Sequence, residues 1–240
     1  MKKMTTLLLA CAMMLFSGCE KERMEYVTGD VKVEVEKGAN WLHDYPLILG
    51  INKKNPPQVA VWVEDMDGRY LSTLYVSYKA GTQGWQGAKG NRRKEALPHW
   101  CHQRGVVYAD GLYLPTKDQP MADGLTGATP RADFEVSMHP KQMPAQFVVK
   151  AEFNHSIDWN DAYPKHAKVG DANYSGGTEG SGQPAVVYAA IVDTTSGKKS
   201  FVAHLIGHSS ADGSDGKVYA DTSRLTSALQ IVKQIKITIQ

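Results

Sequence analysis

Apolar and polar residues alternate with a period of two along much of this chain, a pattern typical of β-strands with one buried face. Residues 31–36, 134–138 and 147–153 all show this alternation. Residues 58–64 (QVAVWVE) are almost continuously apolar, which indicates a central strand. Further strands are expected at residues 70–78, 185–192, 201–208 and 231–239.

Clusters of Asp, Gly and Ser separate these strands. Residues 65–68 (DMDG) and 193–199 (DTTSGKK) have the chemistry of tight turns, so each is predicted to join its flanking strands into a hairpin. Helical patterns are few and short. Residues 92–97 predict one or two turns that Pro98 ends, and residues 222–230 predict a second short helix. We therefore predict an all-β fold: an antiparallel, Ig-like β-sandwich with long irregular loops and one or two short helices.

Two long irregular stretches interrupt the strand pattern, at residues 79–131 and 154–184. Loops of this length in a compact domain usually carry function or move. Functional residues are therefore expected in these two stretches.

The N-terminus has the layout of an export signal. Lys2 and Lys3 precede an almost unbroken apolar stretch from Met4 to Phe16, which is too short to span a bilayer. The residues before Cys19 (LFSG) resemble a bacterial lipobox, which implies cleavage before Cys19 and a lipid on its thiol.

This reading divides the chain into a signal peptide (1–18), a charged and lipidated tether (19–30) and a single β-sandwich domain (31–240). The protein is expected to be exported and held at the membrane by its lipid, in the periplasm or at the cell surface. Two alternatives stay open: a lipobox at Cys11, and a signal or anchor without lipid.

Composition narrows the function classes. Apolar residues make up 42% of the 240 residues and charged residues 22%, which excludes wholesale disorder. The chain has 27 Lys+Arg and 25 Asp+Glu, and two of the lysines belong to the signal, so the mature chain is balanced at 25 against 25. No nucleic-acid partner is expected from this charge. Acylation of Cys19 and loss of Cys11 would leave Cys101 as the one free thiol.

A short motif in the first long loop points to specific chemistry. The segment Asp123-Gly-Leu-Thr126-Gly127-Ala128-Thr129 resembles the covalent flavinylation motif of FMN-binding subunits of ion-pumping oxidoreductases. In that family an extracytoplasmic FAD:protein FMN transferase joins the FMN phosphate to the last hydroxyl residue. The resemblance implies Thr129 as the attachment residue and Asp123, Thr126, Gly127 and Ala128 as recognition residues.

The rest of the mature chain resembles a predicted-periplasmic bacterial family of unknown function that is associated with the same transferase. The segments that carry this resemblance include EALPHW, GQPAVVYAAIV and DGKVYADTSRLTSALQIV. Together the two resemblances imply an electron-transfer carrier with FMN on Thr129, the transferase as a partner and an unidentified redox partner in the envelope. The alternative is an Ig-like binding or structural lipoprotein without a redox cofactor.

A flavin ring needs flat apolar or aromatic walls, and aromatic residues of the two long loops are candidates for them: Trp85, Trp100, Trp159, Tyr108, Tyr113 and Tyr163. Other groups of residues give weaker evidence for a functional site. Residues 99–102 (HWCH) hold three metal-binding side chains but have no second cluster to complete a shell, so no metal site is expected. Residues 176–182 are predicted to form a flexible glycine-rich loop, and Asp158, Asp161, Asp171 and Glu179 have no calcium-loop spacing.

Overall fold

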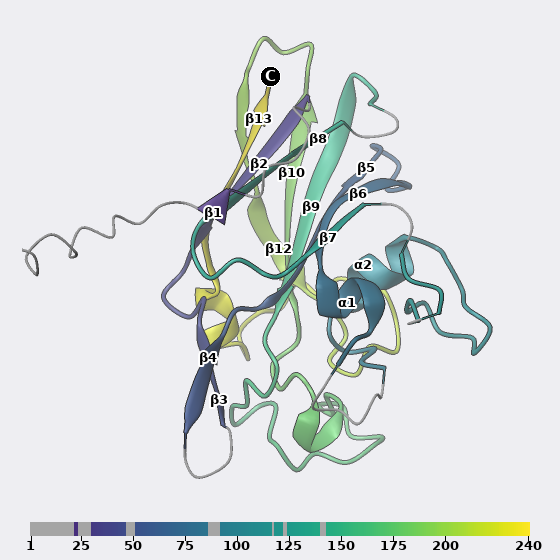
Figure 1. Ribbon diagram of the computed structural model, residues 1–240, viewed down its shortest axis with the longest axis vertical. Coiled ribbons are helices and arrows are strands. Elements are labelled where there is room, and N and C mark those ends of the chain that lie inside the picture. The colour runs from purple at the N-terminus through teal and green to yellow at the C-terminus, as the bar shows by residue number, and fades with distance from the viewer. Residues whose placement is uncertain are drawn as a thin grey trace, which may run out of the picture.

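Two β-sheets pack face to face in the computed structural model, which describes residues 22–23, 30–46, 51–85, 92–116, 118–121, 124–139 and 143–240 (Figure 1). The five-stranded sheet has the order β1 (Glu22–Arg23), β8 (Phe134–Met138), β2 (Val31–Lys37), β13 (Val232–Ile239) and β11 (Ser200–Val202). The six-stranded sheet has the order β12 (His204–His208), β10 (Val186–Asp193), β9 (Gln146–Asn154), β5 (Gln58–Glu64), β6 (Tyr70–Ser77) and β7 (Leu125–Gly127).

The remaining elements are short and lie near one end of the sandwich. They are the hairpin of β3 (His43–Pro46) and β4 (Asn52–Asn55), the helices α1 (Tyr78–Thr82) and α2 (Pro98–Gln103), and two 3₁₀ turns at Gly177–Glu179 and Ser227–Gln230. Strand pairing is antiparallel except for the edge pairs β1–β8 and β6–β7. The predicted all-β sandwich with long loops and short helices is thus confirmed.

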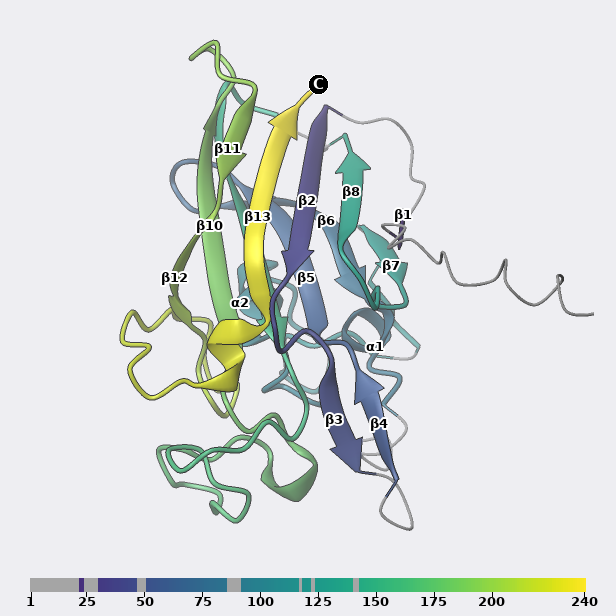
Figure 2. The ribbon, with the colours of Figure 1, turned by 90° about the vertical axis from the view of Figure 1, so that its left-hand side faces the viewer.

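The main core lies between the two sheets, which Figure 2 shows with the five-stranded sheet in front. Alternating valines of β2 face the alternating apolar residues of β5, β9 and β10. Burial of these side chains removes apolar surface from water and is the dominant favourable contribution to folding. The period-two pattern in the sequence is the signature of these inward-facing positions.

A second core covers the outer face of the six-stranded sheet. Ala60 and Trp62 of β5 point away from the first core and pack under Trp100 and Cys101 of α2. Every residue of β5 is therefore buried, which explains its almost continuous apolar sequence. The long stretch after β6 is largely the cover of this second core.

The segment 201–208 is the clearest departure from the predicted strands. It was expected as one strand, but β11 pairs with β13 of one sheet and β12 pairs with β10 of the other. The chain changes sheets at Ala203, which is buried and donates its backbone N–H to the Ile235 carbonyl at 3.0 Å. The apolar pattern continues across the change of sheet, so it could not reveal the break.

The predicted helices are also displaced. Residues 92–97 do not form a helix; instead Pro98 begins α2, because the first helical position needs no N–H donor. Of residues 222–230, only Ser227–Gln230 form a single 3₁₀ turn.

The predicted signal peptide and Cys19 lie outside the described residues. Within the predicted tether, Glu22–Arg23 form β1 and pair in parallel with Phe134 and Glu135 of β8. None of the helices in the described part of the chain has the length and apolar character needed to cross a bilayer.

Candidate functional site

The motif loop joins the two sheets at one edge of the sandwich. Residues 125–127 form β7 beside residues 75–77 of β6, and residues 128–133 then carry the chain over to β8 in the opposite sheet. Gly124 has a φ of +127°, and a Cβ there would lie 2.9 Å from the Thr73 backbone oxygen, so this position favours glycine. Asp123 lies outside the described residues.

Two buried aromatic residues fix the course of this loop. The Tyr75 hydroxyl donates to the carbonyls of Gly127 and Ala128, at 3.3 and 3.2 Å. The Trp41 indole N–H donates to the Pro130 carbonyl at 3.0 Å. The backbone on both sides of Thr129 is therefore anchored to the main core.

The motif residues themselves lie outside both cores. Thr126 and Ala128 are exposed, and Gly127 and Thr129 are partly exposed. The Thr129 hydroxyl makes no hydrogen bond with any residue that the structure describes. Thr129 therefore presents an uncommitted hydroxyl at the molecular surface.

Thr129 lines a groove of about 680 Å³ at the end of the sandwich that carries the β3–β4 hairpin. Segments far apart in the sequence build this groove: β3 and β4, the start of β5, α1, the motif loop and the residues after β9. Its lining comprises His43, Tyr45, Lys53, Asn55, Pro56, Gln58, Ser77, Tyr78, Lys79, Trp85, Arg93, Ala128, Thr129, Arg131, His155, Ser156 and Glu179. We call it the Thr129 groove.

The groove is rich in cations. Lys53, Lys79, Arg93 and Arg131 line it, against Glu179 as the single carboxylate among the described lining residues. Desolvation within the groove, followed by repulsion from Lys53 and Arg93, holds the pKa of Lys79 below its usual range. The arrangement therefore favours an anion.

Only part of this charge is neutralised by the protein. Arg93 is buried and pairs with Glu95 at 2.8 Å, and its guanidinium lies 4.6 Å from the centre of the Trp85 ring. By contrast, Lys53 and Lys79 form no ion pair within the part of the chain that the structure describes, whereas the neighbouring Lys54 is 2.8 Å from Asp44. Lys53 and Lys79 are both exposed and available to a ligand.

Flat rings complete the lining. Tyr78 is 55% exposed beside Lys79, and Tyr45 lies directly opposite Lys53 in the β3–β4 hairpin. The rings of His43 and His155 pack against each other with their centres 5.1 Å apart and their planes tilted by 32°. Burial lowers the pKa of His155 to about 3, so this ring is neutral, and its Nε2 donates to the Asn40 carbonyl at 2.8 Å.

Only one of the aromatic residues proposed as ring walls belongs to the Thr129 groove. Trp85 lines it but is only 7% exposed, and it forms part of the floor rather than an open wall. Trp100 lies fully buried in the second core, and the others do not line the groove: Trp159, Tyr108, Tyr113 and Tyr163. Tyr45 and Lys53 were not predicted, because β3 and β4 lack an apolar alternation. Tyr78 and Lys79 begin α1, which the sequence pattern did not predict.

The competing constellations do not form sites. No group of metal-binding side chains gathers among the described residues. Burial raises the pKa of the Cys101 thiol, and His99 and His102 bond to the backbone carbonyls of Gly216 and Pro98. The glycine-rich segment is packed rather than loose: Ser181 is fully buried and its hydroxyl donates to Asn154 at 2.7 Å.

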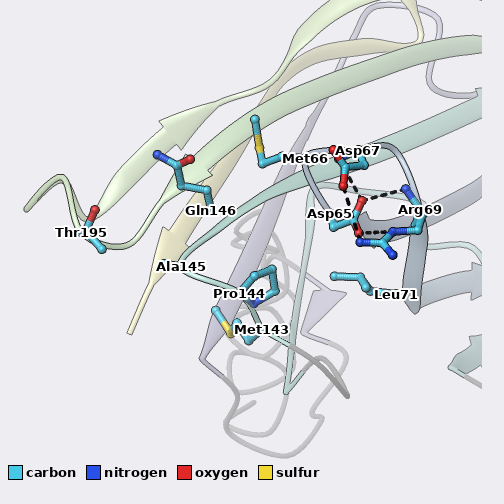
Figure 3. Close-up of a pocket in the computed structure, with 10 residues that line it drawn as sticks. All are labelled: Asp65, Met66, Asp67, Arg69, Leu71, Met143, Pro144, Ala145, Gln146 and Thr195. Atoms are coloured by element: carbon cyan, nitrogen blue, oxygen red, sulfur yellow. Dashed lines mark hydrogen bonds and ion pairs between the residues drawn. The ribbon is translucent and has the colours of Figure 1, made fainter.

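A second cavity, of about 690 Å³, lies at the opposite end of the sandwich (Figure 3). It is formed by the β5–β6 turn and the start of β9. Asp65 accepts hydrogen bonds from the backbone N–H and the Nε of Arg69, so the charges at its rim are already paired. It therefore lacks the uncommitted charge of the Thr129 groove.

Comparisons with protein-family models, with curated proteins and with solved structures found no match to this chain. The Thr129 groove, with its exposed cations and rings, is the candidate functional site of the described residues.

Proposed function

We propose that this protein is an exported, lipid-anchored electron carrier with FMN bound through a phosphoester to Thr129. The supporting observation is the position of Thr129: its hydroxyl, which bonds to none of the described residues, lies at the surface on the rim of a cationic groove with aromatic walls. The resemblance of residues 123–129 to a flavinylation motif gives that hydroxyl a specific chemistry.

The residues of the groove fit a flavin nucleotide. Its volume of about 680 Å³ falls within the range typical of small-molecule sites, roughly 300–1,000 Å³. Lys53 and Lys79 would face the phosphate, and Tyr45 and Tyr78 would offer rings to the isoalloxazine. FMN itself would supply the redox chemistry, and the protein would orient and shield it.

The attachment step transfers an FMN group from FAD to the protein. The Thr129 Oγ1 attacks the phosphorus of the FMN half of FAD, and the bond to the bridging pyrophosphate oxygen breaks. AMP leaves, the hydroxyl proton passes to a base of the transferase, and a phosphodiester remains on Thr129. A threonine hydroxyl is a weak nucleophile, so the transferase must supply the activation, and the protein must supply access.

Co-expression with the transferase and intact-mass measurement test this proposal. The full chain is expected to gain the mass of one FMN less one water and to become yellow. Thr129→Ala should abolish the gain, whereas Thr129→Ser should retain it because the hydroxyl remains.

Thr195→Ala is a matched control, because Thr195 also lies in an exposed turn but at the other end of the molecule. It should gain the same mass as the wild type. An unchanged mass of the wild-type chain, with an active transferase verified on another substrate, would overturn the proposal and favour a binding lipoprotein without a redox cofactor.

A further inference from the structure

We infer that the Thr129 groove binds the phosphate of a flavin nucleotide noncovalently through Lys53 and Lys79, before and independently of any ester on Thr129. This inference deepens the proposed function and takes its ligand class from it. It assigns a preformed recognition site to residues that lie outside the flavinylation motif.

The geometry brings the two lysines into one groove from different elements. Lys53 belongs to the β3–β4 hairpin, and Lys79 belongs to α1 directly after β6. Each is accompanied by a tyrosine: Tyr45 is the cross-strand partner of Lys53, and Tyr78 precedes Lys79. Cross-strand partners project to the same side of a two-stranded ribbon, so the hairpin presents a cation and a ring together.

The positive charges of Lys53 and Lys79 are not neutralised by ion pairs within the described residues. Lys79 is repelled both by Lys53 and by Arg93, whose charge is already shared with Glu95. Crowding of unpaired cations costs free energy in the empty protein, and a bound anion would relieve that cost. A phosphate dianion matches this need, and lysines bind phosphate as point charges.

The rings restrict the ligand further. A bare phosphate would use the lysines but leave the exposed Tyr78 without a partner, whereas a phosphate on an aromatic ring system would contact both. Riboflavin has the ring without the phosphate, and inorganic phosphate has the charge without the ring. FMN should therefore bind more tightly than either.

Titration of the full chain with FMN, riboflavin and inorganic phosphate tests the inference. The protein is purified in detergent from a host without the transferase, so no ester forms, and binding is followed by calorimetry and flavin fluorescence. FMN is expected to bind with micromolar affinity, and about tenfold more tightly than riboflavin. Raising the salt concentration should weaken the binding of FMN and not that of riboflavin.

Substitutions then locate the site. Lys53→Gln and Lys79→Gln should each weaken FMN binding about fivefold, and the double variant about twentyfold. Lys198→Gln is the matched control, since Lys198 is equally exposed but lies in the turn between β10 and β11. Thermal unfolding monitored by circular dichroism establishes that each variant is folded.

Equal affinity for FMN and riboflavin, undetectable FMN binding, or unchanged binding by the double variant would each overturn the inference. Binding of phosphate as tight as that of FMN would also overturn it, because the rings would then contribute nothing. The mass measurement on co-expressed protein is separate: FMN binding without a mass gain refutes the covalent carrier and leaves this site intact, and a mass gain without FMN binding does the reverse.

Discussion

At the scale of single residues, neighbouring side chains hold the backbone of Thr129 at the molecular surface. Tyr75 holds the carbonyls of Gly127 and Ala128, and Trp41 holds the carbonyl of Pro130, so the backbone is fixed while the threonine side chain stays outside the core. A hydroxyl on a fixed backbone loses little further freedom when another enzyme binds it. Tyr75 and Trp41 thus position Thr129 although neither residue lines the groove.

Removing one anchor should be measurable. Tyr75→Phe deletes the hydroxyl that donates to two carbonyls, so the free energy of unfolding should fall by about 1 kcal/mol in urea denaturation. Tyr188→Phe serves as the comparison, because Tyr188 is also a core tyrosine but its hydroxyl bonds to no described residue. It should change stability by less than about 0.5 kcal/mol. Equal effects of the two substitutions would show that the hydroxyl does not anchor the loop.

Some residues of the groove can be predicted from the sequence and others cannot. Thr129 is a candidate because seven consecutive residues resemble a motif, and the structure leaves this residue partly exposed. Lys53 and Lys79 could not be found, because they are 26 positions apart and only the fold brings them together. Lysines in polar segments carry no periodic signal.

At the scale of elements, the junction of β9 and α2 is the most unusual feature. Glu152 of β9 is fully buried in the outer face of the six-stranded sheet and accepts the backbone N–H groups of His99 and Trp100, at 3.2 and 2.8 Å. A carboxylate at the first turn of a helix satisfies donors that have no partner within the helix. Desolvation nevertheless raises the pKa of Glu152 to about 7.

This pKa has a consequence for stability. Because the folded-state pKa lies above the ordinary value of 4.5, the contribution of Glu152 is fully present below about pH 4.5 and is lost as the pH rises through about 7. Between about pH 4.5 and about pH 7, the unfolding free energy of the wild type should therefore fall by roughly 3 kcal/mol relative to that of Glu152→Gln. Urea denaturation at a series of pH values measures it.

The unfolding free energy of the wild type is compared with that of Glu152→Gln because His99 and His155 also make stability depend on pH, and their effect has the opposite sign. Burial holds their pKa values at about 4 and about 3, so their contributions are lost as the pH falls below 6.5. These contributions largely cancel when the variant is compared with the wild type. A pH-independent difference between the two proteins would show that Glu152 does not titrate in this range.

Elements with regular periodicity were predictable, and elements defined by long-range contacts were not. The strand β5 and its hairpin with β6 follow from an apolar run and an Asp-Gly turn. The hairpin of β3 and β4 has no such pattern, since its sequences are HDYP and NKKN. Tertiary contacts also decided that residues 201–208 divide between the two sheets.

At the scale of the whole molecule, the nearly balanced charge of 27 Lys+Arg and 25 Asp+Glu hides a local concentration of cations. Four cationic side chains line the Thr129 groove, with one carboxylate among its described lining residues, although the total charge predicts no nucleic-acid partner. Net charge describes long-range behaviour, whereas a groove acts through the few charges that face it. A small anion can therefore be recognised locally by a protein whose total charge is nearly balanced.

The predicted lipid on Cys19 would hold the whole molecule at a membrane. Radiolabelled palmitate should enter the wild-type chain and should be lost in Cys19→Ala, which should also leave the membrane fraction, since anchoring of this kind depends on acyl chains. Cys11→Ala tests the rival lipobox and should retain the label. Label that persists in Cys19→Ala and disappears in Cys11→Ala would place the lipid at the earlier cysteine.

The crossing of the chain between the sheets beside β7 has one further consequence. Residues 128–133 belong to neither sheet but connect β7 of one sheet to β8 of the other. A group attached at residue 129 would therefore be held through the backbone by both sheets and not by a single edge strand. If FMN is attached there, turning its ring toward an electron donor or acceptor would require rotation of the whole domain.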